Sequence, residues 1–207
     1  MIFINHIFAT TPTLPPTGSY LYEYIVAGNG LFVRAKRPEL EALIQVGFFR
    51  VAGLEPVTPY VSICSRVPRR LISQALLWSV EALPNEALFW FGLDVTTKQW
   101  TIHRPRQIRS KASVRPVDAY DAFGSMALID LHSHNSMPAF FSRTDNRDET
   151  GFRVYAVIGS INTRSNNPPR IKVRIGIYGH MWDIPANWIF DLPPSLVDAL
   201  PDDDEEL

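Results

Sequence analysis

At 207 residues and 23.5 kDa, the chain is long enough for one substantial domain, or for a domain with an appendage. Hydrophobic residues make up 46% and charged residues 20% of the chain, which is typical of a globular protein and excludes disorder on a large scale. The formal net charge of -1 lacks the basic surplus that binding to nucleic acid or to an anionic membrane usually requires, so we expect neither partner.

Cysteine usage and hydropathy indicate the compartment. Cys64 is the only cysteine, so an intrachain disulfide is impossible and a reducing cytoplasm is the natural environment. The first residues, MIFINHIFATT, have neither the positive charge nor the small-residue cleavage site of a signal peptide. No apolar run approaches the roughly 18 residues of a membrane span. We therefore expect a cytoplasmic protein that is neither secreted nor membrane-spanning.

The N-terminal third has the patterns of β-structure. Residues 1–19 are apolar and then rich in threonine and proline, which predicts a short strand and an irregular connection. Alternating aromatic and aliphatic residues then flank Asn29-Gly30, a dipeptide that favours a tight hairpin turn. Tyr20–Ala27 and Leu31–Ala35 are therefore predicted to form a β-hairpin.

The next segments are less regular until a helix begins. Residues 38–46 fit one or two helical turns, but their periodicity does not decide the matter. Residues 51–65 contain two prolines and are expected to be extended. Pro68 is well tolerated in a first helical turn, and apolar residues recur at helical spacing as far as Leu83. This segment is predicted to be an amphipathic helix that ends before Pro84.

Beyond Pro84, short apolar runs alternate with polar turns, which is typical of β-strands. The first two runs are expected to pair antiparallel around a turn at Thr96–Lys98, and Met126–His134 is expected to be a buried strand. No internal repeat is visible. The predicted strands are residues 87–95, 99–105, 107–114, 126–134, 152–161 and 170–184, the last two supplying two or three strands together.

Three segments of this part are predicted to lie outside the strands. Residues 119–125, AYDAFGS, are interpreted as a connector, and Asn162–Pro169 as a polar turn. The last residues, 201–207, form a run of like charges that is expected to be solvated.

Two histidines and an aspartate form the outline of a metal site after the apolar run Met126–Leu131. Side chains two apart in a strand point to one face, so His132 and His134 can converge on one ion. A loop can return Asp145 to the same place. Two nitrogens and one carboxylate oxygen leave a fourth tetrahedral position for water, which distinguishes catalytic zinc from structural zinc. A hydrogen-bonded pair of core histidines is the alternative for His132 and His134 alone.

The spacing H-x-H, seven residues, S-x-x-D resembles the signature of the JAMM (MPN-type) metalloproteases. That signature includes a glutamate upstream, after a helix and at the start of a strand, and Glu86 in PNEALFWFG has this setting. The resemblance implies zinc as the cofactor, with His132, His134 and Asp145 as its ligands. It further implies that Glu86 is the general base, and Glu81 is the next candidate should Glu86 prove wrong.

For Ser142 the resemblance implies a hydrogen bond to the oxyanion of the tetrahedral intermediate. The alternative is an N-cap on the short turn before Asp148, and one hydroxyl is not expected to serve both roles easily. Peptide DLHSH also begins PHP-type phosphoesterases, but further histidine clusters follow there. The other histidines here, His6, His103 and His180, form no such cluster in the sequence.

The chain more closely resembles PRTRC system protein A, a family of bacterial plasmids and mobile elements. This likeness lies in SRVPRRL (65–71), the HSH…MPAFFSRTD block, DETGFRVYAVIGSI (148–161) and IKVRIGIYGH (171–180). The implied fold class is α/β (α+β), a JAMM/MPN-like curved mixed β-sheet flanked by helices, with a small β-rich N-terminal region. The expected domains are residues 1–66 (accessory), 67–192 (metalloprotease) and 193–207 (acidic tail).

The resemblance implies hydrolysis of an amide or isopeptide bond at the C-terminal tail of a ubiquitin-like protein. An E1-like protein encoded nearby is a further implied partner. Two alternatives stay open: a non-catalytic assembly subunit of MPN type, and a peptidase that processes a sulfur-carrier protein. The presence of all five motif positions counts against the first.

Residues around the motif have simpler interpretations. Asp148 and Glu149 are expected to be solvated, because charged loop residues are mostly exposed. Three apolar residues of the metal loop are expected to pack onto the core, with a substrate channel as the alternative: Met137, Phe140 and Phe141. A basic strip is expected to be solvated, with docking of an acidic partner as the alternative: Arg104, Arg106, Arg109, Lys111 and Arg115.

Overall fold

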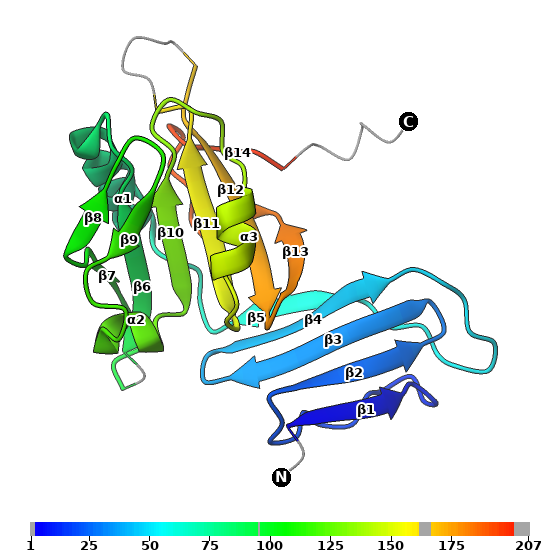
Figure 1. The fold of residues 1–207 in the computed structure, drawn as a ribbon. Helices are drawn as coiled ribbons and strands as arrows, with labels where there is room; N and C mark the ends of the chain where they lie inside the picture. The colour runs from blue at the N-terminus through cyan, green and yellow to red at the C-terminus, as the bar shows by residue number, and fades with distance from the viewer. Residues whose placement is uncertain (1–2, 95, 162–166, 201–207) are drawn as a thin grey trace. The chain divides into compact units, whose positions relative to one another are not determined.

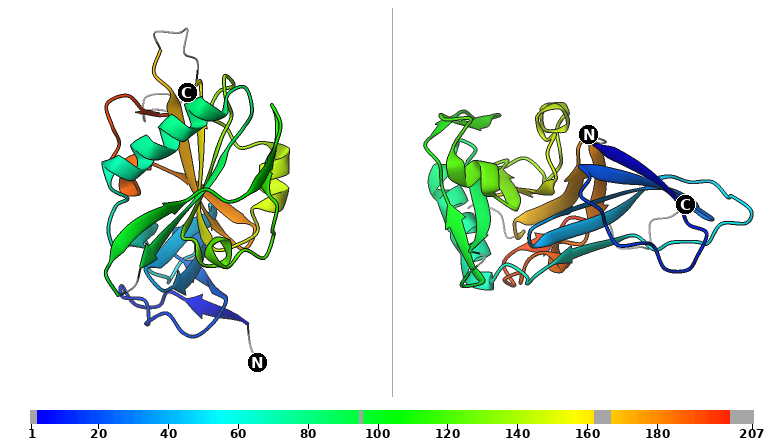
Figure 2. Two further views of the ribbon diagram at one scale, coloured as in Figure 1. Left: turned by 90° about the vertical axis from the view of Figure 1, so that its left-hand side faces the viewer. Right: turned by 90° about the horizontal axis from the view of Figure 1, so that it is seen from below.

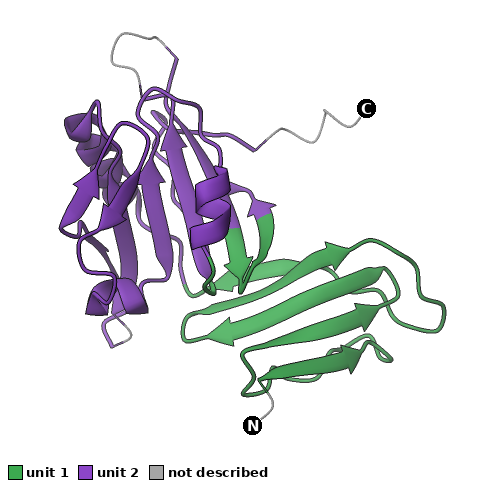
Figure 3. Ribbon diagram, in the orientation of Figure 1, with its two compact units in different colours: residues 1–64, 150–152, 175–182 green, residues 65–149, 153–174, 183–207 purple. Residues whose placement is uncertain are grey.

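The computed structural model describes residues 3–94, 96–161 and 167–200, which mix strands with short helices (Figure 1). The chain falls into two compact units, one comprising residues 1–64, 150–152 and 175–182, the other the remaining residues (Figure 3). In the described residues, no helix is long and apolar enough to cross a membrane. The mixed α+β architecture with a β-rich N-terminal region agrees with the predicted fold class.

The N-terminal unit is built on a five-stranded sheet. Strand β1 runs parallel to β2, and the following neighbours are antiparallel. The first strand and the hairpin were both predicted, although the turn residues are Gly28–Asn29, one position earlier than expected. In order across the sheet the strands are β1 (Ile4–Phe8), β2 (Tyr22–Ala27), β3 (Gly30–Arg37), β4 (Leu40–Gly47) and β5 (Tyr60–Ile63).

Residues 38–46, for which one or two helical turns were considered, form most of strand β4. Glu39 has a φ of 66° in the tight turn that reverses the chain after β3. Leu40, Ala42 and Ile44 are buried and pair with β3 in register. Cross-strand pairing of these side chains therefore decided a segment whose periodicity was ambiguous.

The second unit is built on a larger mixed sheet. Its order is β13-β12-β11-β10-β6-β7, with β14 beside β12. Strand β10 lies between β11, to which it is parallel, and β6, to which it is antiparallel. The strands are β6 (Leu88–Asp94), β7 (Gln99–His103), β10 (Ile129–Ser133), β11 (Arg153–Gly159), β12 (Arg170–Ile177), β13 (His180–Ile184) and β14 (Val197–Asp198). The last segment of predicted strand thus supplies both β12 and β13.

Helices lie on both faces of this sheet (Figures 1 and 2). The predicted helix is α1 (Arg69–Ala82), whose Trp78 stacks on Phe89 of β6. Helix α2 (Ala122–Met126) packs on the next residue of β6, Trp90, which points to the opposite face. Gly124 permits this approach, because a Cβ there would lie 2.5 Å from the indole. The remaining helical segments are α3 (Arg143–Asp148) and the 3-10 turn Ala186–Trp188.

Two connections differ from the predictions. Residues 107–114 were predicted as one strand. The chain instead forms a hairpin over residues 107–116, of β8 (Gln107–Arg109) and β9 (Val114–Pro116), because Ser110 and Ser113 bond to each other and close a turn. The connector at 119–125 contains most of α2, whose first turn is capped by Asp121, with its carboxylate accepting from two backbone amides. Met126 ends that helix and is 74% exposed, so the buried strand begins only at Ile129.

Some predictions are not tested by this structure. Most of the polar turn at 162–169, and the acidic run at 201–207, lie outside the described residues. The domain boundaries at 66 and 192 concern segments able to fold alone, so they stay predictions. The N-terminal unit recruits residues 150–152 and 175–182, which no boundary in the sequence indicated.

Candidate metal centre

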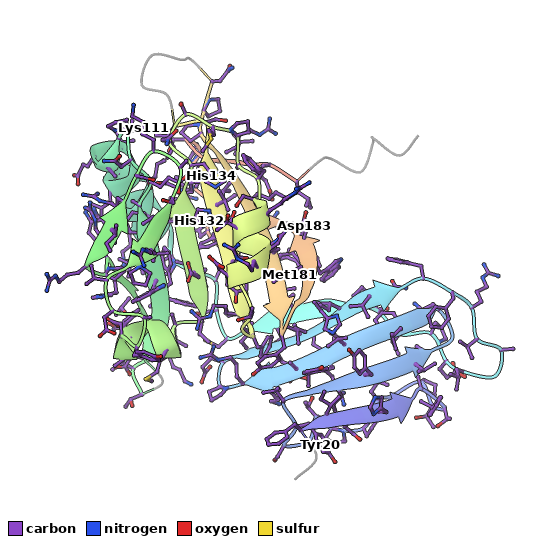
Figure 4. All side chains as sticks on the ribbon, viewed as in Figure 1. Tyr20, Lys111, His132, His134, Met181 and Asp183 are labelled. Atoms are coloured by element: carbon purple, nitrogen blue, oxygen red, sulfur yellow. The ribbon has the colours of Figure 1, made fainter. Side chains whose placement is uncertain are left out.

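Strand β10 brings the two histidines to one end of the larger sheet (Figure 4). His132 lies in the strand and His134 just beyond it, and the Nε2 atoms of the two rings are 3.1 Å apart. The backbone amide of His134 donates to the carbonyl of Ile158 on β11. Both side chains are buried. The central position of β10 between two hydrogen-bonded neighbours therefore holds the pair in place before any ion binds.

Helix α3 brings the carboxylate. Ser142 and Asp145 form a capping box, in which each side chain accepts a hydrogen bond from the backbone amide of the other. Oδ2 of Asp145 accepts from the Ser142 amide at 2.6 Å, while Oδ1 lies 3.6 Å from Nε2 of His132. One carboxylate oxygen thus orients the side chain, and the other faces the histidines.

The three ligand atoms fit a zinc ion. They lie within 4.8 Å of one another, and no second such group of three occurs in the part of the chain that the structure describes. A tetrahedral ion with bonds of about 2.0–2.1 Å separates its ligand atoms by about 3.3–3.4 Å. Two of the three separations lie on either side of that value, 3.1 Å between the two histidine nitrogens and 3.6 Å between His132 and Asp145. Two imidazoles and one carboxylate are also the donor types of a catalytic zinc site.

Burial keeps the histidines in the form that binds metals. Desolvation lowers the pKa of His132, against the attraction of the Asp145 carboxylate, and lowers the pKa of His134 as well. Both imidazoles are therefore neutral at pH 7 and have a lone pair free for an ion.

Glu86 lies beside the pair because of strand register. His132 is opposite Leu88, and one further step pairs Ser133 with Ala87 through two hydrogen bonds. Continuing the register places Glu86 opposite His134, on the same face of the sheet. Glu86 is buried, and desolvation, followed by repulsion from Asp145, raises its pKa to about 7. Glu81, by contrast, lies on α1 with its side chain 64% exposed, 3.9 Å from Arg104.

The Ser142 hydroxyl is an N-cap and keeps its proton available. It accepts from the Asp145 amide at 3.2 Å, which uses an oxygen lone pair. Its O–H can still donate to another acceptor. The two interpretations of Ser142 are therefore compatible, contrary to the expectation that one hydroxyl would not serve both. The structure establishes the cap, and the oxyanion contact stays a prediction.

Arg174 of β12 holds the helix that carries Asp145, and sequence analysis missed it. Its guanidinium donates twice to one oxygen of Glu149, at 2.8 and 2.6 Å, and once to Asn146 at 2.6 Å. It also lies 3.8 Å from the ring centre of Phe141. The prediction that Glu149 is solvated was therefore wrong, because α3 turns it toward a buried cation, whereas Asp148 is exposed as expected.

The loop between His134 and Ser142 places one aromatic ring against a histidine of the site. Phe140 is 40% exposed, and its ring centre is 4.8 Å from that of His134. Phe141 packs against Arg174 instead, which agrees with a packing role. A Cβ at Gly159 would clash with the backbone at Pro138, so this glycine lets the loop lie against the end of β11.

Asp130 is a second titratable group on the histidine face that sequence analysis missed. It lies two residues before His132, so the alternation of the strand already places it there. It accepts from Nε1 of Trp90 at 3.2 Å and lies 3.9 Å from Arg153. Burial, opposed by Arg153, raises the pKa of Asp130 to about 6.

The β8–β9 hairpin is attached to the start of β6. Gln107 accepts from the amide of Leu88 and donates to its carbonyl, and the amide of Glu86 donates to the carbonyl of Ser110. Arg104 lies near Glu81 at 3.9 Å, and the other members of the basic strip are exposed on or beside this hairpin: Arg106, Arg109, Lys111 and Arg115. The hairpin that carries most of these cations is thus bonded to the backbone of Glu86, and the docking role of the cations stays a prediction.

The remaining histidines do not join the site. His103 of β7 stacks on Trp90, while His6 and His180 belong to the N-terminal unit. In that unit, Tyr24 stacks with His6, and its hydroxyl is 3.0 Å from Nε2 of His180. The further histidine clusters of a PHP-type site are therefore absent from the described residues.

Comparison with known proteins gives one family match. The family model for prokaryotic homologs of the JAB domain matches residues 68–174, a range that contains every residue of the candidate metal centre. Among solved structures, the chain is similar to the solution structure of protein DSY2949 from Desulfitobacterium hafniense, at 18% sequence identity and a TM-score of 0.38. That similarity covers 62% of this chain and 92% of DSY2949. No curated protein matches the chain.

Proposed function

The chain belongs to the family of prokaryotic JAB-domain proteins, and from this premise we propose that it is a zinc-dependent peptidase. The observation that carries the proposal is the convergence of His132, His134 and Asp145, with the buried carboxyl of Glu86 near enough to Asp145 to be repelled by it. Members of a family can lose activity while keeping the fold. Here both the ligand set and a buried carboxylate beside it are intact, which favours catalysis over a purely structural role.

The chemistry follows from the donor set. A zinc ion held by the three ligands would supply an acidified water molecule and polarise the scissile carbonyl. Glu86 accepts the proton of the attacking water and returns it to the departing amine. In the metal-free chain, burial raises the pKa of Glu86 to about 7, and the positive charge of a bound zinc ion would lower this pKa and favour the carboxylate form that accepts a proton.

Ser142 completes the proposed site. Its hydroxyl oxygen accepts from the Asp145 amide, and in the proposed mechanism its O–H donates to the oxyanion that forms during hydrolysis. Loss of a donor of this kind typically costs ~3–4 kcal/mol of transition-state stabilisation. Ser142→Ala should therefore lower kcat; it also removes the side-chain cap of α3 but keeps the backbone amide that orients Asp145, so its kcat is compared at saturating zinc.

We propose a ubiquitin-like protein as the substrate, cleaved after its C-terminal tail, with an E1-like protein encoded nearby as a partner. Support comes from the resemblance of residues 148–161 and 171–180 to PRTRC system protein A. These residues form parts of β11 and β12, the strands beside β10. Deconjugation and precursor processing share this chemistry, including the processing of a sulfur carrier.

The test compares three variants for zinc content and for cleavage of ubiquitin-like proteins encoded beside the gene. The double variant His132→Ala/His134→Ala and Asp145→Ala should both lose zinc and activity. Glu86→Gln should keep zinc while its rate falls by ~10²–10⁴-fold, because only proton transfer is removed. Zinc retained in the double variant, or a wild-type rate in Glu86→Gln, would refute this assignment.

A further inference from the structure

Asn135 joins the segments that meet at the metal centre. It follows His134 directly, is 8% exposed, and has a φ of 45°, in the left-handed region. Its side-chain amide donates to the carbonyl of Lys111 at 2.7 Å and to that of Pro84 at 3.2 Å. Its side-chain oxygen accepts from the amide of Ser136 at 2.5 Å. Each polar atom of this buried side chain is therefore engaged with a different part of the backbone.

The two acceptors belong to the surroundings of Glu86. Pro84 precedes Glu86 by two residues, and Lys111 lies in the turn of the β8–β9 hairpin. The amide of Glu86 itself donates to the carbonyl of Ser110, in the same turn, at 2.9 Å. Asn135, Glu86 and the hairpin turn thus form a closed ring of hydrogen bonds, anchored beside His134 (Figure 4 shows Lys111 and both histidines).

We propose that Asn135 is a positioning residue, which fixes Glu86 and the hairpin turn relative to the two histidines. This inference deepens the proposed function, since Glu86 is the group whose placement it explains. Neither atom of the Asn135 amide is a ligand in the proposed site, because both are engaged with backbone groups. Its removal should therefore affect proton transfer and leave zinc binding unchanged.

The chemistry of the position favours asparagine. The backbone needs a left-handed conformation, which asparagine, aspartate and glycine adopt more readily than other residues. The two carbonyl partners need a side chain with two donors. Glycine meets the first requirement alone, and an ionised aspartate would present acceptors to two carbonyl oxygens. Asn135→Gly thus removes the side-chain amide and keeps the left-handed backbone conformation. Asn135→Asp replaces the two N–H donors with a carboxylate oxygen, which cannot donate to the two carbonyls.

The experiment measures kinetics and zinc affinity in the full chain, with a peptide ending in Gly-Gly joined to aminocoumarin as the probe substrate. Asn135→Gly should lower kcat by ~10–100-fold, as supporting groups of metal sites typically do. KM and zinc affinity should stay as in the wild type. Asn135→Asp should lose at least as much kcat, despite its similar size.

A second readout needs no catalysis. Hydrogen exchange at the Glu86 amide should be faster in Asn135→Gly by ~10-fold or more, because the ring that protects it is opened. Asn29→Gly is the matched control. Asn29 also bridges backbone groups, donating to the carbonyl of Val57 at 2.9 Å and accepting from its amide at 3.0 Å, in the N-terminal unit. This control should lower stability without changing kcat or exchange at Glu86.

Three outcomes would overturn the inference. Wild-type kcat together with wild-type exchange at Glu86 in Asn135→Gly would show that the amide positions nothing. If Asn135→Gly binds zinc more weakly but has the wild-type kcat once zinc is bound, Asn135 supports the zinc ligands and does not position Glu86. Equal losses of kcat in Asn29→Gly and Asn135→Gly would indicate a general effect of stability. If the wild type cleaves no substrate, the proposed function fails, and exchange at Glu86 still decides the positioning role.

Discussion

Individual residues of the metal centre are prepared by their surroundings before an ion arrives. Desolvation lowers the pKa of His132 and of His134, so both rings are neutral at pH 7. It also raises the pKa of Glu86 to about 7 in the metal-free chain. The capping box orients Asp145 through one oxygen and leaves the other toward the histidines. Because these side chains are already ordered, metal binding costs little of their conformational entropy.

Glu86 should make the stability of the metal-free protein depend on pH. The pKa of Glu86 is about 7 in the folded state, against an ordinary value of 4.5 for a solvated glutamate, so folding favours the protonated form. The carboxyl therefore costs nothing below pH 4.5 and destabilises the fold progressively as the pH rises through 7. Above that pH, the cost is at most about 3 kcal/mol.

Glu86→Gln removes this titration with little change of shape. In urea unfolding with a chelator present, the variant and the wild type should be equally stable at low pH, and the variant more stable at pH 8. Other buried carboxyls, such as Asp130, titrate in both proteins and cancel in the difference. A difference between the two proteins that does not change with pH would contradict the buried, protonated state of Glu86.

At the scale of elements, β10 and α3 supply the ligands, and each is held by a neighbour. Strand β10 is bonded on both sides, to β11 and β6. Helix α3 has only six residues, too few to be stable by itself, and no residue in it is buried. Its position depends on the capping box at one end and on the bonds from Arg174 to Asn146 and Glu149.

Arg174→Met should therefore weaken zinc binding as well as stability. Loss of the cation leaves Glu149 buried without its partner, which typically costs ~3–5 kcal/mol. The helix that carries Asp145 also loses its attachment to β12, so zinc affinity should fall by ~10–100-fold. Competition with a zinc chelator measures that affinity.

Arg34→Met is the matched control for this substitution. Arg34 and Arg174 are both 4% exposed, and each forms an ion pair at 2.6 Å, Arg34 with Glu23 in the N-terminal sheet. The control should lose comparable stability and keep wild-type zinc affinity. If the two variants bind zinc equally well, Arg174 supports the fold only.

The whole molecule combines two units that are not contiguous in sequence. The N-terminal unit includes the turn between β12 and β13, where Tyr178 stacks on Tyr22 and His180 lies against Tyr24. Arg37 also donates to the carbonyl of Phe152 within this unit. The aromatic side chains of Tyr178 and His180 therefore pack within the N-terminal unit, although both residues are far from its strands in sequence.

Deletion of residues 1–60 tests whether the N-terminal unit is accessory. All proposed ligands lie within residues 132–145, so the shortened chain should still bind one zinc ion. Its melting temperature should fall, because Tyr178 and His180 lose their aromatic partners. Elemental analysis and thermal unfolding check both points. A product that does not fold would show that the two units form one integrated domain, against the boundary at residue 66.

The sequence by itself determined the parts of this protein that depend on local pattern and spacing. Helical periodicity after Pro68 predicted α1, strand alternation predicted most of the sheets, and the H-x-H and S-x-x-D spacing named His132, His134, Ser142 and Asp145. These features follow from bond geometry along a short stretch of chain. The proximity of Glu86 came from resemblance, and strand register then explained it.

Only the tertiary structure decided the features that depend on contacts distant in sequence. Residues 38–46 became a strand because β3 pairs with them, and residues 107–114 became a hairpin whose turn binds Glu86. Arg174 and Asn135 have no local signature, since each acts on partners 24 or more residues away, Pro84 and Lys111 for Asn135 and Glu149 for Arg174. A buried polar side chain meets its hydrogen-bond partners only in the folded chain, so the spacing of residues along the sequence does not predict its role.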